Sequence, residues 1–234
     1  MTTATPPISR LNNLRDLGGI PVAGGVFSYG RVFRSDDVST IPADEARELW
    51  DRGIRTIIDL RSAEEADHTG RGPLADYDIA YHRLPIRRGG ADPDEFLRHL
   101  RERSATAATV GDYYASTLAA EASTIVVGLR TIAEGSGGTL FHCAAGKDRT
   151  GIFAAALLSV LGASDAEIAR DYFRAVAEGR DAVSPLLGAE HEAMLAMLCR
   201  LDVAHGGALE VLRGGGLSPQ AIAILRERLV EPLA

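Results

Sequence analysis

The feature of this sequence that most restricts its fold is a strand, a short polar loop and a helix that follow one another directly. Residues 139–142 (Thr-Leu-Phe-His) form a segment of strand length, Cys143–Arg149 is a polar loop that contains a glycine, and Thr150–Leu161 is a mostly apolar run of helical length. A strand that leads straight into a helix is typical of a parallel sheet, because the helix carries the chain back to the start of the next strand. The loop is then expected at the carboxyl end of its strand, where open α/β sheets bind ligands.

Other strands and helices are predicted on both sides of this unit. Pro42 and Gly53 bracket a helix over Ala43–Arg52. Ser62 and Glu65 have the spacing of a capping box that opens a second helix. The remaining predicted elements are strands at Thr56–Leu60 and Ala80–Leu84, a β-hairpin of Val26–Tyr29 with Arg31–Arg34 at the sheet edge, and helices at Pro93–Arg103, Ala107–Ala120, Ser123–Glu134, Ser164–Ala175 and after Ser218. The sequence therefore predicts an α/β fold, with a central, mostly parallel sheet flanked by helices and a helical tail.

Composition narrows the class of protein. Of the 234 residues, 46% are hydrophobic and no linker divides the chain, so we expect a disordered lead over residues 1–9 and a single domain over residues 10–234. The net charge of −7, without a basic stripe, argues against nucleic acid as a partner. The longest apolar stretch, Ile152–Leu161, is about half of the roughly 20 residues that a bilayer span needs, so no integral membrane association is expected. The absence of a signal peptide and the low cysteine content favour the cytoplasm, with signal-less export as the alternative.

The loop itself has the residues of an anion site. A loop that turns into a helix directs several backbone N–H groups and the positive end of the helix dipole to one point, which suits a tetrahedral oxyanion. The same positive field favours the thiolate of Cys143, the nucleophilic form of cysteine. Arg149 lies six positions later and can grip two phosphate oxygens with its planar fork. The predicted phosphate cradle consists of Ala144, Ala145, Gly146, Lys147, Asp148 and Arg149.

The segment His142-Cys-Ala-Ala-Gly-Lys-Asp-Arg-Thr-Gly151 resembles the HCxxGKDRTG loop of a family of bacterial tyrosine-protein phosphatases. Residues 13–19, 32–36 and 53–61 resemble that family's N-terminal blocks in the same order, so the resemblance extends from residue 12 to residue 173. It implies a cysteine-phosphatase-like fold with a helical lid or tail. It also implies an atypical dual-specificity phosphatase that acts on phosphotyrosine, sometimes on phosphoserine or phosphothreonine and often on phosphoinositides, without a metal or other cofactor. The expected partners are therefore phosphoprotein or phosphoinositide substrates.

The resemblance implies a role for each reactive loop residue. Cys143 attacks phosphorus and forms a cysteinyl-phosphate that water later cleaves. Arg149 and the loop amides hold the equatorial oxygens. Thr150 donates its hydroxyl to the cysteine sulfur, and His142 orients the loop by hydrogen bonds.

The leaving oxygen needs a proton, and two carboxyl groups are candidates for the general acid. Asp148 lies within the loop beside Arg149, and Asp59 ends a predicted strand at the same edge of the sheet. We favour Asp148 and keep Asp59 as the alternative, since the Trp-Pro-Asp loop of ordinary tyrosine phosphatases is missing from this sequence. Lys147, the only lysine in the chain, adds a positive charge for a second phosphate, which favours phosphoinositides.

Other interpretations of the same residues fit less well. His142 and Cys143 lack the spacing of a metal site, so no metal is predicted. Cys199, on an apolar helix, is expected to be a structural thiol. A sulfurtransferase also uses a loop cysteine at a helix start, but its chemistry does not need Arg149. The remaining rival is a phosphate-binding module without turnover. The oligomeric state and the physiological substrate stay open.

Two groups of residues outside the loop complete the prediction. Arg34, Asp36 and Arg61 are interpreted as an ion-pair network beneath the site. The pairs Arg87-Arg88 and Tyr113-Tyr114 fall in a stretch that can fold over the crevice as a lid, with core packing as the alternative for the tyrosines.

Overall fold

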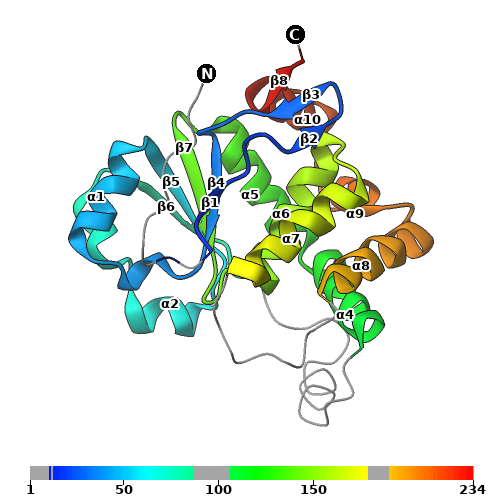
Figure 1. Ribbon diagram of the computed structural model, residues 1–234, viewed down its shortest axis with the longest axis horizontal. Helices are drawn as coiled ribbons and strands as arrows, with labels where there is room; N and C mark the ends of the chain where they lie inside the picture. Colours follow the sequence, from blue (N-terminus) through cyan, green and yellow to red (C-terminus); the bar gives the residue numbers. More distant parts are fainter. Residues whose placement is uncertain (1–10, 12, 87–105, 179–189, 234) are drawn as a thin grey trace.

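The computed structural model describes residues 11, 13–86, 106–178 and 190–233, and a five-stranded sheet forms its centre (Figure 1). Its strands, in spatial order, are β1 (Arg15–Asp16), β4 (Val32–Ser35), β7 (Gly138–His142), β5 (Ile54–Asp59) and β6 (Ala80–Arg83). The last four are parallel, and the edge strand β1 runs antiparallel to β4. The mostly parallel sheet is thus confirmed, and its middle strand is the one that leads into the polar loop.

The sheet is buried on both faces. Along β5 and β7, Ile57 and Leu140 belong to one apolar core, whereas Ile58 and Phe141 belong to the other. This alternation follows from the two-residue period of a strand. Such strands read as continuous apolar runs because helices cover both sides of a parallel sheet.

The two faces carry very different numbers of helices (Figure 1). The smaller core lies beneath η1 (Val38–Thr40), α1 (Ala43–Asp51) and η2 (Gly72–Asp76). The larger core lies beneath α4 (Ala107–Ala120), α5 (Ala122–Glu134), α6 (Asp148–Leu161), α7 (Asp165–Glu178), α8 (Glu190–His205), α9 (Ala208–Gly214) and α10 (Pro219–Leu229). The predicted helical tail therefore packs onto the same face as the helix that follows the loop. Within the described parts of the chain, no helix combines the length and apolarity needed to cross a membrane.

The predicted β-hairpin of Val26–Tyr29 with Arg31–Arg34 is wrong. The first segment contains β3 (Gly25–Phe27), which pairs with β2 (Pro21–Val22) and with the C-terminal β8 (Val230–Pro232) in a separate antiparallel sheet. The second segment contains β4, which lies inside the large sheet. All of β4 is buried, so it needs neighbours and cover on both sides, which an edge hairpin does not provide.

Most helix signals are confirmed. Pro42 precedes α1, and the capping box that opens α2 (Ala63–Thr69) is complete. Its two bonds run from the Glu65 amide to Ser62 Oγ (3.1 Å) and from the Ser62 amide to a Glu65 carboxylate oxygen (2.8 Å). The predicted helix over Pro93–Arg103 and the N-terminal lead lie outside the described residues.

The helix after the loop begins two residues earlier than the sequence predicts. Its first turn closes through a 2.6 Å hydrogen bond from the Gly151 amide to the Lys147 carbonyl. Asp148 and Arg149 are therefore the first helical residues of α6 rather than loop residues. Both side chains consequently sit at the positive end of the helix dipole.

Candidate active site

The loop after β7 leaves the sheet between the carboxyl ends of β4 and β5, with α2 at the same edge (Figure 1). Three successive carbonyls of this loop accept hydrogen bonds from surrounding elements. The donors are the Asp37 amide to Ala144 (3.1 Å), Asn13 Nδ2 to Ala145 (2.8 Å) and Arg34 Nη2 to Gly146 (3.0 Å). The C=O and N–H of a trans peptide unit point in opposite directions, so outward carbonyls turn the N–H groups toward the inner side of the loop. That arrangement suits an anion.

Gly146 is the one loop position where the backbone requires glycine. Its φ is +67°, and an added Cβ would lie 2.6 Å from the Asp36 nitrogen and 2.7 Å from the Ser35 carbonyl oxygen. Both contacts are with backbone atoms at the end of β4, which cannot rotate away as a side chain can. Glycine therefore allows the loop to pack directly against the end of β4.

Cys143 is the first residue of the loop and is 2% exposed. The Nδ1 atom of His142 lies 3.3 Å from the Cys143 carbonyl oxygen. A carbonyl only accepts, so Nδ1 carries the proton of this bond. Burial lowers the pKa of His142 and keeps the imidazole neutral. His142 thus holds the backbone at the start of the loop, which is the supporting position predicted for it.

Arg149 extends from the first turn of α6 to Glu65 in the first turn of α2. Its Nη1 and Nη2 atoms lie 2.5 and 2.9 Å from the two carboxylate oxygens of Glu65. The hydrogen bond from Arg149 is the main cause that lowers the pKa of Glu65 to about 2. The end-on pair leaves the Nε edge of the guanidinium, a second two-pronged donor that matches two phosphate oxygens.

Asp148 is half-buried in the first turn of α6 and accepts a hydrogen bond from the hydroxyl of Tyr114 on α4. Tyr114 is 1% exposed, so its ring belongs to the larger core. Of the two interpretations of the tyrosine pair, core packing therefore holds for Tyr114. Arg87 and Arg88, the other predicted lid residues, lie outside the described residues.

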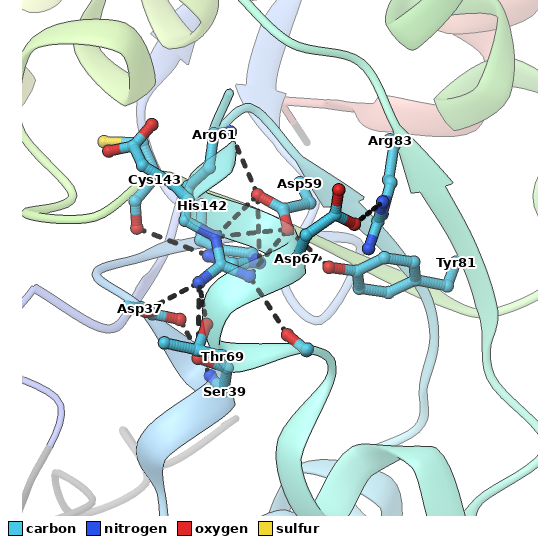
Figure 2. Close-up of polar contacts among 12 residues, drawn as sticks. Asp37, Ser39, Asp59, Arg61, Asp67, Thr69, Tyr81, Arg83, His142 and Cys143 are labelled. Atoms are coloured by element: carbon cyan, nitrogen blue, oxygen red, sulfur yellow. Dashed lines mark hydrogen bonds and ion pairs between the residues drawn. The ribbon is translucent and has the colours of Figure 1, made fainter. Parts of the chain in front are cut away.

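Asp59, the alternative acid, lies beneath the loop in a closed network (Figure 2). Its side chain is fully buried and accepts hydrogen bonds from the Arg61 amide (2.9 Å), Arg61 Nη2 (2.8 Å) and the Tyr81 hydroxyl. Burial by itself would raise the pKa of Asp59, but the hydrogen bonds from Arg61 and Tyr81, together with the contribution of His142, outweigh it and lower the pKa to about 2. Asp59 is thus held as a carboxylate.

Arg61 donates hydrogen bonds to residues of β5, of α2 and of the segment after β4 (Figure 2). Besides Asp59, its guanidinium donates to Asp37 (2.7 Å), Thr69 (2.7 Å) and Ser39 (3.2 Å). Asp37 belongs to the segment whose amide binds a loop carbonyl, and Thr69 ends α2. The network predicted for Arg61 is therefore confirmed, and it fixes the two segments on either side of the loop.

A second ion-pair network joins the loop to α7. Arg34 is fully buried, and its Nη1 lies 2.5 Å from Asp171 while its Nη2 binds the Gly146 carbonyl. Arg15 completes the network with a 3.0 Å contact to the same carboxylate. Burial would raise the pKa of Asp171, but the charges of Arg34 and Arg15 lower it. Asp36, also assigned to a network, accepts a 3.3 Å hydrogen bond from the Asn13 amide.

The other predicted site residues take varied positions. Ala144 and Ala145 are exposed, Lys147 is half-buried at the start of α6, and Thr150 is buried in its first turn. The Thr150 hydroxyl has no hydrogen-bond partner within the described residues. Cys199 is a free thiol that is exposed on α8.

Four residues that support the site were not identified as site residues from the sequence. Glu65 was predicted as a helix cap only, and its second contact needs knowledge of where Arg149 lies. Asn13, Asp171 and Tyr172 act on the loop or its neighbours across the chain, and no local spacing marks them.

A parallel α/β sheet that presents a cysteine, inward-facing amides and an arginine at the carboxyl end of its middle strand has the architecture of the cysteine-dependent phosphatases. A model of the tyrosine phosphatase family matches residues 6–231. The chain belongs to this tyrosine phosphatase family.

Individual relatives agree with the family. The chain is similar to a putative tyrosine-protein phosphatase of Cupriavidus necator, with 30% identity over 173 residues that cover 69% of this chain and 59% of that protein. It is also similar to the triple specificity protein phosphatase PtpB of Mycobacterium tuberculosis, with 26% identity over 185 residues that cover 69% of this chain and 66% of PtpB. The chain thus spans about two thirds or less of the length of these relatives. A crystal structure of P. aeruginosa TpbA in complex with pTyr aligns over 74% of this chain and 90% of that chain, with 20% identity and a TM-score of 0.32.

Proposed function

We propose that this protein is a metal-independent, cysteine-dependent phosphatase that hydrolyses phosphomonoesters through a cysteinyl-phosphate intermediate. The observation that carries the proposal is the outward bonding of three successive loop carbonyls, which turns the amides inward beside Cys143 and Arg149. Such a cradle matches the three equatorial oxygens of a phosphoryl group.

The chemistry proceeds in two displacements. The thiolate of Cys143 forms a bond to phosphorus as the bond to the leaving oxygen breaks, and Asp148 gives its proton to that oxygen. Water then attacks the phosphorus, gives its proton back to Asp148 and displaces the sulfur, which releases inorganic phosphate. Arg149 and the loop amides hold the equatorial oxygens throughout. The Thr150 hydroxyl, which has no hydrogen-bond partner in the described parts of the chain, is suited to donate to the departing sulfur.

Asp148 is the better candidate for the general acid. It stands in the first turn of α6, one residue from Arg149, and is partly open to solvent. Asp59, by contrast, is fully buried, and its carboxylate oxygens already accept hydrogen bonds from Arg61 and Tyr81, so it is not open to a leaving group. We assign Asp59 a structural role beneath the loop.

The proposed substrates are phosphotyrosine first, with phosphoserine, phosphothreonine and phosphoinositides as further candidates. Membership of the tyrosine phosphatase family supports phosphotyrosine. The name of PtpB, a triple specificity phosphatase, supports a wider range. Lys147 at the start of α6 supports a second phosphate, because its ammonium group is a point charge beside the cradle.

The experiment is phosphate release in the presence of EDTA from phosphotyrosine, phosphoserine and phosphothreonine peptides and from mono- and bis-phosphorylated inositol lipids. Cys143→Ser protein, which keeps the cradle but loses the thiol, is the blank. Turnover above this blank supports the proposal. Turnover by Cys143→Ser close to that of the wild type would overturn the cysteine mechanism, and phosphate binding without turnover would favour a binding module.

Two further variants separate the finer assignments. Asp148→Asn should lower the rate of hydrolysis of phenyl phosphate far more than that of 4-nitrophenyl phosphate, because the 4-nitrophenolate leaves without a proton. An equal loss on both substrates would remove Asp148 from the acid role. Lys147→Ala should lower the rate of hydrolysis of bis-phosphorylated lipids more than that of phosphotyrosine. Equal losses on both substrates would contradict a contact between Lys147 and a second phosphate.

A further inference from the structure

Two tyrosines from different helices meet next to Asp148. Tyr114 on α4 and Tyr172 on α7 have their hydroxyl oxygens 2.8 Å apart, and Tyr114 also contacts Asp148 Oδ1. Both tyrosines are 1% exposed. They come from positions 34 residues before and 24 residues after Asp148, so only the folded chain brings this group together.

The direction of these hydrogen bonds follows from counting protons. A tyrosine hydroxyl has one proton to donate, and a carboxylate accepts only. Tyr114 therefore donates its one hydrogen bond to Asp148 Oδ1, and the Tyr172 hydroxyl donates to the oxygen of Tyr114. Burial raises the pKa of Tyr114 well above its ordinary value, so Tyr114 stays a donor at all working pH values.

Close helix packing holds the pair in place. An added Cβ on Gly151 of α6 would lie 2.6 Å from a ring carbon of Tyr172, so glycine at this position lets α7 approach. The rings of Tyr114 and Tyr172 meet edge to face with centroids 6.0 Å apart. Neither ring can turn without displacing its neighbours, because both are in the close-packed core.

We propose that Tyr114 is a positioning residue for the acid step, which orients the Asp148 carboxyl, and that Tyr172 in turn orients the hydroxyl of Tyr114. The proposal rests on the function proposed above, in which Asp148 donates a proton to the leaving oxygen.

The physical consequence is a choice between the two oxygens of Asp148. Because Oδ1 accepts from Tyr114, the proton of the carboxylic acid resides on Oδ2, and Oδ2 is the atom that protonates the leaving group. When this proton departs, the hydrogen bond from Tyr114 becomes charge-assisted and stronger. Tyr114 thus stabilises Asp148 more after proton transfer than before it, which is the kind of interaction that raises a rate.

The test is Tyr114→Phe, which removes the hydroxyl and keeps the ring. We expect kcat on phenyl phosphate to fall about 10-fold, with KM unchanged and 4-nitrophenyl phosphate affected less than about 2-fold. Tyr29→Phe is the control, since it removes the hydroxyl of a tyrosine that follows β3 and is 59% exposed, and it should leave both rates unchanged. A merely structural role for Tyr114 would slow both substrates alike, and that result would overturn the proposal.

A double-mutant cycle separates this proposal from the assignment of Asp148. In the Asp148→Asn background, Tyr114→Phe should have no further effect on phenyl phosphate, because the acid it orients is gone. If the two losses multiply, the positioning role is wrong even where Asp148 is the acid. If Asp148→Asn alone leaves the rate of hydrolysis of phenyl phosphate unchanged, Asp148 is not the acid, and the positioning role of Tyr114 is wrong as well.

If Tyr114→Phe does not fold, Tyr172→Phe provides a second test of the positioning role. This variant leaves Tyr114 bound to Asp148 but removes the second hydroxyl, so it should lower the phenyl phosphate rate in the same selective way and by less. Thermal unfolding of each variant checks that the folded protein is measured. An unselective loss, or none, in folded Tyr172→Phe would overturn the role of the pair.

Discussion

Arg149 and Glu65 form a two-bond ion pair that joins the first turn of α6 to the first turn of α2. Glu65 has two partners, because its carboxylate also accepts a hydrogen bond from the Ser62 amide of the capping box. The residue that begins α2 therefore also fixes the direction of the arginine that is proposed to hold phosphate.

The first prediction concerns this ion pair. Glu65→Gln keeps an acceptor for the capping box but removes the charge that holds Arg149. We expect vanadate, as a phosphate mimic, to bind about 10-fold more weakly, because Arg149 must then be ordered by the ligand itself. The inhibition constant for vanadate measures the effect.

Glu64→Gln is the matched control, since Glu64 lies next to Glu65 in the first turn of α2 and is exposed. It should leave the vanadate constant unchanged. Equal effects of the two substitutions would show that general charge in this turn, and not the contact with Arg149, sets the affinity.

The second prediction concerns Gly146. Gly146→Ala introduces strain at a φ of +67° and a clash with the backbone after β4, so we expect loss of turnover and a loss of stability above the roughly 1 to 2 kcal/mol typical of left-handed strain. Gly30→Ala is the control, because its φ is +72° but an added Cβ meets nothing within 4 Å. Urea unfolding compares the two variants. Equal destabilisation would contradict the clash.

The reactive centre was predictable because its signals are local. Cys143, Asp148 and Arg149 lie within seven consecutive positions between an apolar strand and an apolar helix, so spacing alone places them at one helix start. The helix boundary was shifted by two residues because the polar Asp148 and Arg149 look like loop residues in sequence, although they form the first turn.

The residues that hold the centre in place could not be found in the same way. Glu65 lies 84 positions from Arg149, and Asp171 lies 137 positions from Arg34. Such pairs form because β4, α2, α6 and α7 meet at one edge of the sheet, which is a property of the whole fold. The hairpin prediction failed for a related reason, since the small apolar blocks around Tyr29 carry no signal that they enter different sheets.

The third prediction concerns Arg34, which connects Asp171 to the Gly146 carbonyl. Arg34→Met removes both bonds and leaves the Asp171 carboxylate buried with Arg15 alone, so we expect a loss of stability of about 3 to 5 kcal/mol. Arg34→Lys keeps the charge but lacks the fork that reaches both partners, so it should fold and bind vanadate more weakly. Urea unfolding and the vanadate constant report the two effects. Wild-type vanadate affinity in Arg34→Lys would show that the Gly146 contact does not shape the loop.

The last prediction concerns acid stability. The pKa of Asp59 is lowered from 3.8 to about 2 in the folded protein, so the stability that it contributes is complete above the unfolded value and is lost as the pH falls from about 4 toward 2. For this fully buried group the contribution is about 2 kcal/mol. Asp59→Asn should therefore be less stable than the wild type at pH 7, and the difference should shrink as the pH approaches 2. Urea unfolding of both proteins across this range measures it. A difference that stays constant with pH would mean that the Asp59 carboxylate is not held ionised by Arg61.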